Sequence, residues 1–530
     1  MESDSLGKVA PGTTPLSVQM VAYEGVIPRV GEYVILEDGG IRVLGTITDV
    51  IMGASELERE DLLQANYYDK ILKLIERPSN WVKASIKMIG VLDGKKISGT
   101  PKVPISPATD VKRAPTDILT EIFKPNEGDG IRIGKLMTRD DVDVYLDPDE
   151  ILSRHLAILA VTGAGKSNTV AVILEEILRL GGVALLFDIH SEYSNMSLDC
   201  DSCYIETIQP EIDPLTLSLD EIAKLIGISY ESAAKIYIFL KRAYFNARKL
   251  LMREELYDYI KRAGIDSDPQ DLLAGIHAIV KLSIDGEGES DDENLIKYSR
   301  KDRESVLSLL ARLEHVRDRY SRVLVSQAGE IVDHLNYGKL VVVDLGQLDT
   351  ELTDIVVGKT LLTLLERAKA RRMGSNVWIP IPVLSVIEEA HILVPSTMDT
   401  YTNYAASQIA REGRKFGVGL CLVSQRPKGI NTDILSQMVN KIILRVIEPE
   451  DQAYIRRATE FLSEDMVKYL PSLDIGEAVV VGPMIKIPAL IKVRLSKAKR
   501  RGESLKAREL WKMGTEKKDF EDDYYSAIGD

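Results

Sequence analysis

The sequence predicts an α/β protein whose centre is a nucleotide-binding core with a mostly parallel sheet. The first observation is that a strand, a glycine-rich loop and a helical pattern follow one another over residues 156–180. The second is the alternation of apolar strands with helical segments, which is typical of a parallel sheet covered on both faces. The third is that acidic residues follow several of these strands, at the sheet edge where ligands bind in such folds.

The N-terminal part of the chain, residues 1–105, is predicted to form a small β-barrel. A first β segment, 32–37, ends at Asp38-Gly39-Gly40, which is a hairpin signal. Residues 41–50 then alternate with period two, and 81–92 form another β segment before a glycine turn. Several short strands closed by glycine turns indicate a barrel.

The nucleotide-binding core is predicted in two parts, residues 131–215 and 329–475. Prolines punctuate the segment 106–130 before it, which is interpreted as a linker. Between the two parts, residues 216–328 carry apolar side chains at helical spacing over long stretches. This segment is therefore predicted to be a helical insertion within the core.

The C-terminal part, residues 476–530, begins with two β segments, 478–482 and 485–495, that are interpreted as a hairpin. A basic cluster follows at 497–501, which is either a brace or a solvated tail. The final residues, 516–530, are acidic and aromatic.

The loop over residues 160–167 predicts a phosphate-binding site, although an alanine stands where such loops usually have their first glycine. Gly163 and Gly165 allow the backbone to turn its N–H groups toward a β-phosphate, and the following helix adds its positive end. Lys166 is placed to reach the β- and γ-phosphates. The hydroxyl of Ser167 is placed to ligate Mg²⁺.

Carboxylates follow two of the predicted core strands. Glu388 stands where a nucleoside triphosphatase usually holds Mg²⁺, and Glu389 is positioned to polarise the attacking water. Asp188 either acts near the metal or orients that water. For His190 and Glu192, a structural role in the same loop is as well supported as a catalytic one.

Polar and basic residues near other strands complete the predicted site. Gln425 ends a core strand and is interpreted as a sensor of the γ-phosphate. Arg414 or Arg411 either neutralises charge on the phosphoryl group of a neighbouring subunit or complements the end of its own helix. Arg154 and His155, just before the first core strand, are further candidates.

Bulk properties exclude several classes of protein. The net charge of −14 means that any nucleic-acid site must be local. The chain shows neither a signal peptide nor an 18-residue apolar run, which predicts an intracellular, cytoplasmic protein without membrane contact. Cys200 and Cys203 are interpreted as ordinary thiols or a local disulfide, because a zinc site would need further ligands.

Taken together, the motifs resemble those of the HerA family, the archaeal branch of the HerA/FtsK DNA-pumping ATPases with RecA/FtsK-like cores. The stretches that carry the resemblance are 155–168, 187–193, 387–391, 411–417 and 424–427. The resemblance implies a homohexameric ring that moves along double-stranded DNA as a translocase and helicase, using ATP and Mg²⁺. It also implies a NurA-type nuclease on the barrel side and work beside the Mre–Rad complex in end resection and double-strand break repair.

The resemblance also assigns roles to individual residues of this chain. The catalytic group that it implies is Glu389 as base, Glu388 and Asp188 for metal and water, Gln425 as sensor, and Arg414 as the arginine supplied to a neighbour. The metal ligands that it implies are Ser167 and Glu388. The ATP contacts that it implies come from Arg154, Thr162, Gly163, Ala164, Gly165, Lys166, Ser167, Asn168, Lys499 and Arg500.

Two other functions remain open from the sequence. In one, ATP sets the assembly state of a regulatory switch, and the positioned base Glu389 would then be of little use. In the other, the chain is a coupling ATPase of a type IV secretion or conjugation system, but such proteins usually carry membrane helices.

Overall fold

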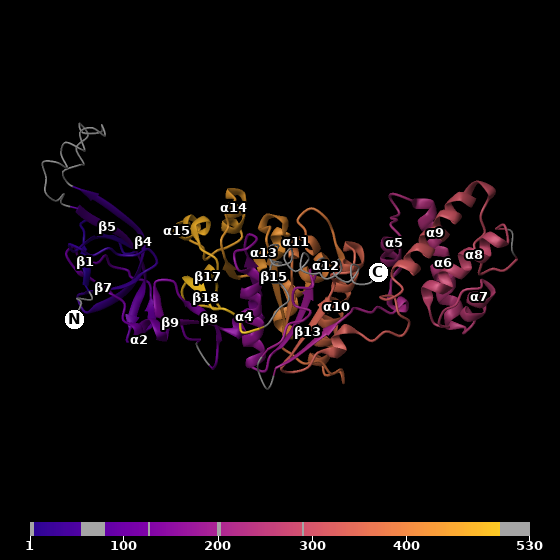
Figure 1. Ribbon diagram of the computed structural model, residues 1–530, viewed down its shortest axis with the longest axis horizontal. Helices are drawn as coiled ribbons and strands as arrows, with labels where there is room; N and C mark the ends of the chain where they lie inside the picture. The colour runs from indigo at the N-terminus through magenta and orange to yellow at the C-terminus, as the bar shows by residue number, and fades with distance from the viewer. Residues whose placement is uncertain (1–4, 55–79, 126–127, 199–202, 289–290, 499–530) are drawn as a thin grey trace, which may run out of the picture.

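The computed structural model describes residues 5–54, 80–125, 128–198, 203–288 and 291–498, arranged in three parts along a long axis (Figure 1). The barrel lies at one end, the sheet of the core in the middle and the helical insertion at the other end. The predicted α/β class with an N-terminal barrel is confirmed.

The barrel is a six-stranded sheet in the order β2-β1-β7-β3-β4-β5, closed by pairing between β2 and β5, with β6 added beside β5. Along β5 buried and exposed side chains alternate, so one face of the strand fills the barrel. The strands are β1 (Ser5–Val9), β2 (Ser17–Ala22), β3 (Tyr33–Asp38), β4 (Ile41–Ala54), β5 (Asn80–Asp93), β6 (Lys96–Gly99) and β7 (Asp110–Arg113).

One barrel strand lies in the segment that was expected to be a linker. β7 pairs with both β1 and β3, so residues 110–113 are integral to the barrel. Three of its four residues are charged and only Val111 is fully buried, which is why the sequence pattern did not indicate a strand. The rest of the expected linker holds α2 (Thr116–Ile122), whose apolar side is buried against β9.

The core is an eleven-stranded sheet in the order β12-β13-β11-β14-β15-β10-β16-β17-β18-β8-β9. The first seven strands of this order are parallel, and the remaining neighbours are antiparallel, including the hairpin β17–β18. The strands are β8 (Ile131–Leu136), β9 (Arg139–Leu146), β10 (Leu156–Leu159), β11 (Val183–Asp188), β12 (Tyr204–Ile208), β13 (Lys339–Asp344), β14 (Val383–Ile387), β15 (Val418–Ser424), β16 (Asn440–Ile443), β17 (Glu477–Val481) and β18 (Ala489–Val493).

Helices cover both faces of this sheet, which explains why its central strands are apolar throughout. Every residue of β11, β14 and β15 is buried. α4 (Lys166–Arg179) packs on one face, whereas α10 (Thr350–Arg372) and α12 (Tyr401–Phe416) pack on the other. The remaining core helices are α3 (Pro148–Arg154), α11 (Ala390–Leu393), α13 (Thr432–Gln437), α14 (Pro449–Arg457) and α15 (Glu464–Tyr469).

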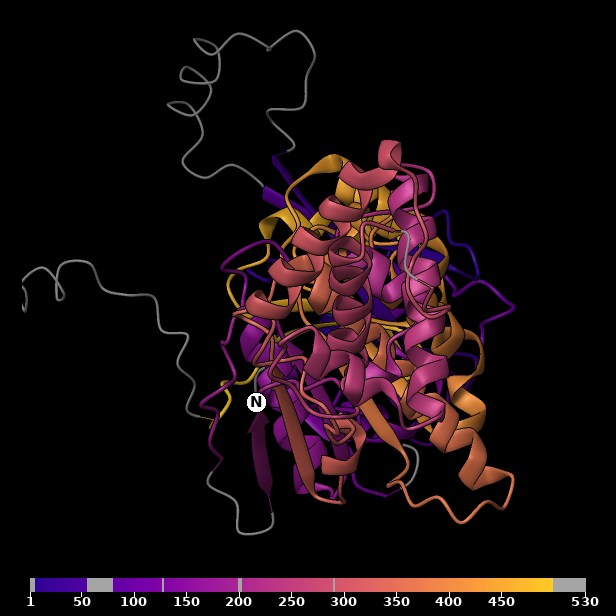
Figure 2. The same cartoon turned by 90° about the vertical axis from the view of Figure 1, so that its right-hand side faces the viewer.

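The insertion follows β12 and forms the end of the molecule opposite the barrel, nearest the viewer in Figure 2. The chain enters and leaves it side by side, because Ile212 and Leu324 form a parallel bridge. Its helices are α5 (Leu219–Leu225), α6 (Ala234–Met252), α7 (Leu256–Arg262), α8 (Leu272–Asp285) and α9 (Arg303–Arg319).

Two further predictions concern cysteines and membranes. Cys203 is disulfide-bonded, so the expectation of an ordinary thiol there is wrong, and Cys200 lies outside the described residues. Among the described residues, no helix is long and apolar enough to cross a bilayer.

Candidate functional site

The glycine-rich loop lies at the carboxyl end of β10 and leads directly into α4. Gly163 and Gly165 have positive φ angles of 77° and 103°, which residues with a Cβ adopt only with strain. A Cβ on Gly165 would also lie 3.2 Å from the backbone nitrogen of Gly476. The loop therefore depends on these glycines to point its backbone N–H groups at a ligand.

Lys166 meets both carboxylates that follow β14. Its Nζ forms an ion pair with Glu389 Oε1 and lies 3.3 Å from Glu388 Oε2, and both glutamates are almost fully buried. Burial disfavours the ammonium, but the two carboxylates outweigh it and raise the pKa of Lys166. Burial raises the pKa of Glu388. Burial also acts to raise the pKa of Glu389, but hydrogen bonds from Lys166 and Gln425 outweigh it and lower that pKa.

Gln425 connects the phosphate loop to Glu389. β15 lies between β10 and β14 in the sheet, so the residue that follows β15 stands between the two motifs. The side chain of Gln425 accepts a hydrogen bond from Thr162 Oγ1 and donates one from Nε2 to Glu389 Oε1 at 2.5 Å. A change in the loop that moves Thr162 is therefore passed to Glu389 through one side chain.

Glu389 is held in a left-handed backbone conformation, with φ 45° and ψ 44°. Such a conformation costs a non-glycine residue of order 1–3 kcal/mol and is found preferentially at functional sites. Its second carboxylate oxygen, Oε2, has no hydrogen bond within the described part of the chain and faces His391 Nδ1 at 3.4 Å. His391 Nδ1 also lies 3.2 Å from the hydroxyl of Ser424. Burial lowers the pKa of His391, which favours the neutral imidazole.

The loop after β11 brings two further side chains into the site. The carboxylate of Asp188 accepts hydrogen bonds from the backbone N–H groups of Glu192 and Tyr193 and so shapes the loop. Glu192 Oε2 accepts from the hydroxyl of Ser167 at 2.8 Å, and the fully buried Tyr193 donates to Glu388 Oε1 at 2.7 Å. Burial raises the pKa of Asp188.

The sequence did not predict a role for Tyr193, because a single tyrosine after a strand does not by itself indicate a function. Its contact with Glu388 depends on how the loop after β11 folds across the neighbouring strand β14. Only the folded chain brings these two residues together.

The side chains present fit a magnesium ion bound together with a nucleotide. Among the described residues, no cluster of three or more His, Cys, Asp or Glu side chains could hold a metal ion alone. Mg²⁺ in phosphate sites typically takes one or two protein oxygens and completes its shell with phosphates and water. The hydroxyl of Ser167 and the nearby carboxylates of Glu192 and Glu388 are oxygen donors of this kind.

The predicted arginines lie at the opposite edge of the sheet from the loop of their own subunit. Arg154 ends α3 just before β10 and pairs with Glu150 at 2.6 Å. Arg414 lies in the last turn of α12, just before β15, and is exposed with no ion pair among the described residues. The seven residues of β15 span about 20 Å, so Arg414 does not reach the nucleotide site of its own chain. Arg154 is separated from the phosphate loop by the four residues of β10, about 13 Å, and its guanidinium is held by Glu150.

Asn168 binds the C-terminal segment of the chain. Its Nδ2 donates to the carbonyl of Arg494 at 2.8 Å, and its Oδ1 accepts from the N–H of Ser496 at 3.0 Å. The side-chain amide of Asn168, which was expected to contact ATP, therefore holds the segment that follows β18. Lys499 and Arg500 lie outside the described residues.

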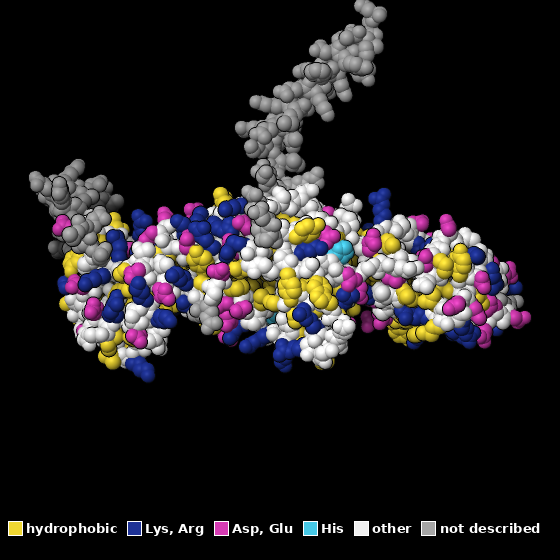
Figure 3. Space-filling model, turned by 90° about the horizontal axis from the view of Figure 1, so that it is seen from below, with side chains coloured by type: hydrophobic (Ala, Val, Ile, Leu, Met, Phe, Trp, Pro, Cys, Tyr) yellow, Lys and Arg dark blue, Asp and Glu magenta, His cyan; other side chains and the backbone are white. Residues whose placement is uncertain are grey.

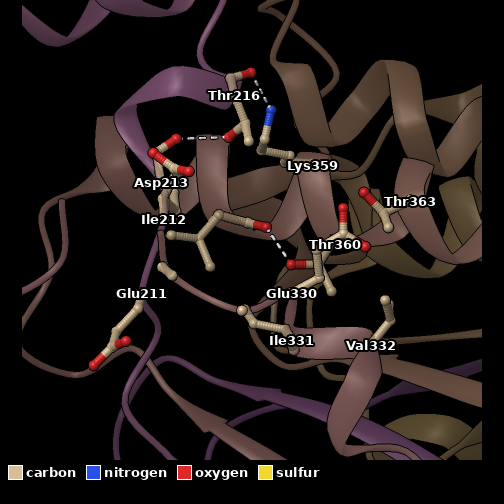
Figure 4. A pocket seen from close by; sticks show the side chains of 13 residues that line it. Glu211, Ile212, Asp213, Thr216, Glu330, Ile331, Val332, Lys359, Thr360 and Thr363 are labelled. Atoms are coloured by element: carbon tan, nitrogen blue, oxygen red, sulfur yellow. Dashed lines mark hydrogen bonds between the residues drawn. The ribbon is translucent and has the colours of Figure 1, made fainter. Parts of the chain in front are cut away.

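A separate small pocket lies where the insertion meets the core (Figure 4). Lys359 Nζ reaches across it to the carbonyl of Thr216 at 2.7 Å, and Thr360 bonds to the backbone of its own helix. Lys359 is thus engaged in joining the two parts and Thr360 is satisfied within its own helix, so the chemistry is expected at the loop after β10.

Two family models match the chain. The model described as "Helicase HerA, central domain" matches residues 131–364, and "Helicase HerA-like C-terminal" matches residues 380–495.

Curated relatives match over nearly their whole length. A DNA double-strand break repair helicase HerA of Sulfolobus acidocaldarius is 37% identical over 490 residues, which cover 92% of this chain and 93% of the relative. The protein of the same name in Saccharolobus solfataricus is 36% identical over 471 residues, 89% of either chain. A probable helicase of Methanocaldococcus jannaschii is 34% identical over 510 residues, which cover 95% of this chain and 94% of the relative.

Solved structures with a related outline are more distant in sequence. VirB4 of Thermoanaerobacter pseudethanolicus has a TM-score of 0.43 and 19% identity, covering 71% of this chain and 99% of that one. The bacterial conjugative coupling protein TrwB has a TM-score of 0.47 and 12% identity, covering 74% of this chain and 94% of that one. The family models and the curated relatives together show that the chain belongs to the HerA helicase family and is an enzyme of the P-loop ATPase class.

Proposed function

We propose that this enzyme is an ATP-driven translocase and helicase on double-stranded DNA that acts in the repair of double-strand breaks. The observation that carries the proposal is the chain of contacts Thr162–Gln425–Glu389–Lys166, which joins the phosphate loop to a buried carboxylate. The curated relatives are named as double-strand break repair helicases, which supports DNA as the substrate and break repair as the pathway.

Hydrolysis requires a water molecule in line with the γ-phosphate and a group that accepts its proton. Glu389 suits this role because hydrogen bonds keep it ionised and its Oε2 is available. When a nucleotide binds, its phosphates attract Lys166, which then leaves Glu389 and frees the carboxylate to act on water. A movement of the phosphate loop would reach that carboxylate through the side chain of Gln425.

ATP would be held together with Mg²⁺, which supplies positive charge against the phosphate oxygens. Ser167 and Glu388 are the residues that we expect to hold the metal, with Glu192 and Tyr193 orienting them through hydrogen bonds. This loop follows β11, whose residues are all buried, so the strand fixes the position at which the loop begins.

The placement of the arginines supports a ring in which subunits complete one another's sites. Arg414 is exposed and lies too far from the nucleotide of its own chain, and Arg154 lies at the same edge of the sheet. If six copies form a closed ring, this edge faces the phosphate loop of the next subunit, and Arg414 neutralises charge on the transferred phosphoryl group. Lys499 and Arg500 would reach the same nucleotide from the C-terminal segment.

A NurA-type nuclease is proposed to dock on the barrel, and the assembly would process DNA ends beside the Mre–Rad complex. The barrel carries several exposed apolar side chains that a partner could cover. These exposed side chains are Leu16, Val21, Tyr23, Ile27, Ile51 and Met52.

The test measures ATP turnover and displacement of a third strand from a DNA triplex, with and without blunt duplex DNA. We expect duplex to stimulate turnover severalfold, and the third strand to be displaced only when ATP is hydrolysed. Lys166→Ala should abolish both activities while the protein still folds. Turnover that is indifferent to DNA, with no strand displacement, would refute the motor and favour an ATP-dependent assembly switch.

A further inference from the structure

The outer face of α6 in the helical insertion is unusually basic for this acidic protein. No acidic residue lies between Glu231 and Glu254, whereas six basic residues do: Lys235, Lys241, Arg242, Arg248, Lys249 and Arg253. Figure 3 shows acidic and basic side chains interspersed over the face of the molecule seen from below. A single-sign stretch of this length is therefore a local feature, of the kind that an acidic DNA-binding protein needs.

A second basic segment lies against the same face. Residues 297–303 contain four basic residues and one acidic residue, Asp302. They border a groove that is also lined by Lys235, Ile238 and Arg242 of α6. The contact is direct, because Lys235 pairs with Asp302 at 2.9 Å. The two segments thus form one surface.

Several cations on this surface have no protein partner. Lys241, Arg300 and Lys301 are exposed and form neither ion pairs nor side-chain hydrogen bonds within the described part of the chain. By contrast, Lys249 pairs with Glu293, and Arg248 stacks on Tyr244. The unpaired charges gain most from an external anion, since no internal ion pair has to be broken.

We infer that the basic face of the insertion, formed by Lys241, Arg242, Lys297, Arg300 and Lys301, binds the phosphate backbone of double-stranded DNA outside the ATPase core. The inference rests on the proposed function, because it gives the translocase a second contact with duplex DNA. The face lies at the end of the molecule away from the barrel, so DNA would meet it on the side opposite the proposed nuclease (Figure 1).

Apolar side chains on the same helix raise a competing possibility. Ile238, Phe245 and Met252 are 39%, 55% and 84% exposed, and basic helices with apolar residues also bind anionic membrane surfaces. Duplex DNA is favoured because the unpaired cations come from two segments, α6 and residues 297–303. The three apolar residues stand seven apart and so share one side of α6, but an interfacial helix would carry its cations on the same helix, without a second segment.

The test is fluorescence anisotropy of a labelled blunt duplex of 30 base pairs, titrated with the full chain at several salt concentrations. The variant Lys241→Gln/Arg300→Gln/Lys301→Gln should bind at least about tenfold more weakly at 100 mM salt, and its log–log salt slope should fall by about 2–3. The charge-keeping variant Lys241→Arg/Arg300→Lys/Lys301→Arg should bind like the wild type. A matched control, Lys87→Gln/Lys102→Gln/Lys112→Gln on the barrel, changes net charge equally and should leave affinity unchanged.

Other results would overturn the inference. Equal affinity and slope in the triple-glutamine variant would show that DNA does not touch this face. Loss of binding to phosphatidylglycerol vesicles, with DNA binding intact, would assign the face to a membrane. Failure of the motor is distinguishable, because turnover without DNA, and turnover at saturating duplex, should be the same in the triple-glutamine variant and the wild type. A wild type that duplex does not stimulate would instead refute the proposed function.

Discussion

The ammonium group of Lys166 is bonded to the carboxylate of Glu389, so that the residue expected to hold phosphate is neutralised by the residue expected to activate water. Both side chains are nearly inaccessible to solvent, and Glu388 lies within 3.3 Å of the same ammonium. The site without nucleotide is thus electrostatically satisfied from within. A nucleotide that enters must compete with Glu389 for Lys166.

This competition predicts that Glu389→Gln separates binding from turnover. A neutral amide holds Lys166 less strongly, so ATP affinity should stay equal or rise, while turnover falls by about 10²–10⁴-fold because the proton acceptor is lost. Titration with a fluorescent ATP analogue and steady-state hydrolysis measure the two effects. Weaker binding in this variant would contradict the competition, and unchanged turnover would remove Glu389 from the role of base.

Tyr193→Phe should impair metal use without unfolding the protein. The lost hydroxyl donates to Glu388, and hydrogen bonds to charged groups contribute about 1.5–3 kcal/mol. We expect turnover to fall by about tenfold or more and the Mg²⁺ concentration for half-maximal turnover to rise. Tyr230→Phe, at an exposed position of the insertion, is the matched control and should behave as the wild type. An unchanged Mg²⁺ dependence in Tyr193→Phe would show that this hydroxyl has no part in the metal site.

Arg414→Ala should reduce turnover by about 10³-fold or more if the arginine acts on the site of a neighbour. Arg411→Ala, one turn earlier on the same helix, tests the other candidate and should leave turnover near that of the wild type. The sharper measurement mixes Arg414→Ala subunits with Glu389→Gln subunits, each inactive alone. Some interfaces of a mixed ring then combine an intact Glu389 with an intact Arg414, so activity should return. No recovery on mixing would place the two residues in one subunit's site and contradict the ring arrangement.

His155 should make the fold sensitive to acid. It is buried and its Nδ1 accepts a hydrogen bond from the N–H of Leu420 at 3.1 Å, and burial lowers the pKa of His155 to about 4. Because the unfolded chain takes up this proton near pH 6.5, the stabilisation is complete above that pH and is lost as the pH falls toward 4. The loss would total about 3 kcal/mol.

Chemical denaturation of wild type and His155→Asn at several pH values checks this prediction. The asparagine oxygen can accept the same hydrogen bond but does not titrate. The wild type should lose stability relative to the variant between pH 6.5 and 4, at up to about 1.4 kcal/mol per pH unit. Parallel pH dependence in the two proteins would show that His155 is already charged or does not control acid unfolding.

The sequence indicated the central features of the site because each lies at the end of an apolar strand. Glu388, Asp188 and Gln425 follow β14, β11 and β15, and parallel strands bring their carboxyl ends to one edge. The order of those strands was not readable from the chain. Gln425 therefore emerged as the link between Thr162 and Glu389 only from the structure.

Other features depended on contacts that no local pattern encodes. β7 is short and mostly charged, and its strand conformation comes from its two barrel neighbours rather than from its own propensity. Asn168 follows the loop that holds phosphate and was expected to contact the nucleotide, but its amide binds the backbone of the C-terminal segment. Arg154 lies near the loop in sequence but a strand length away from it in space.

The left-handed backbone conformation of Glu389 lowers the stability of the fold at a position where activity requires a carboxylate. A glycine would adopt this conformation without strain, so a chain selected for robustness alone would carry glycine there. The carboxylate that the enzyme needs is thus kept at the expense of a more durable fold. Engineering this protein for heat resistance should therefore leave that residue untouched and look for gains in the barrel and the insertion instead.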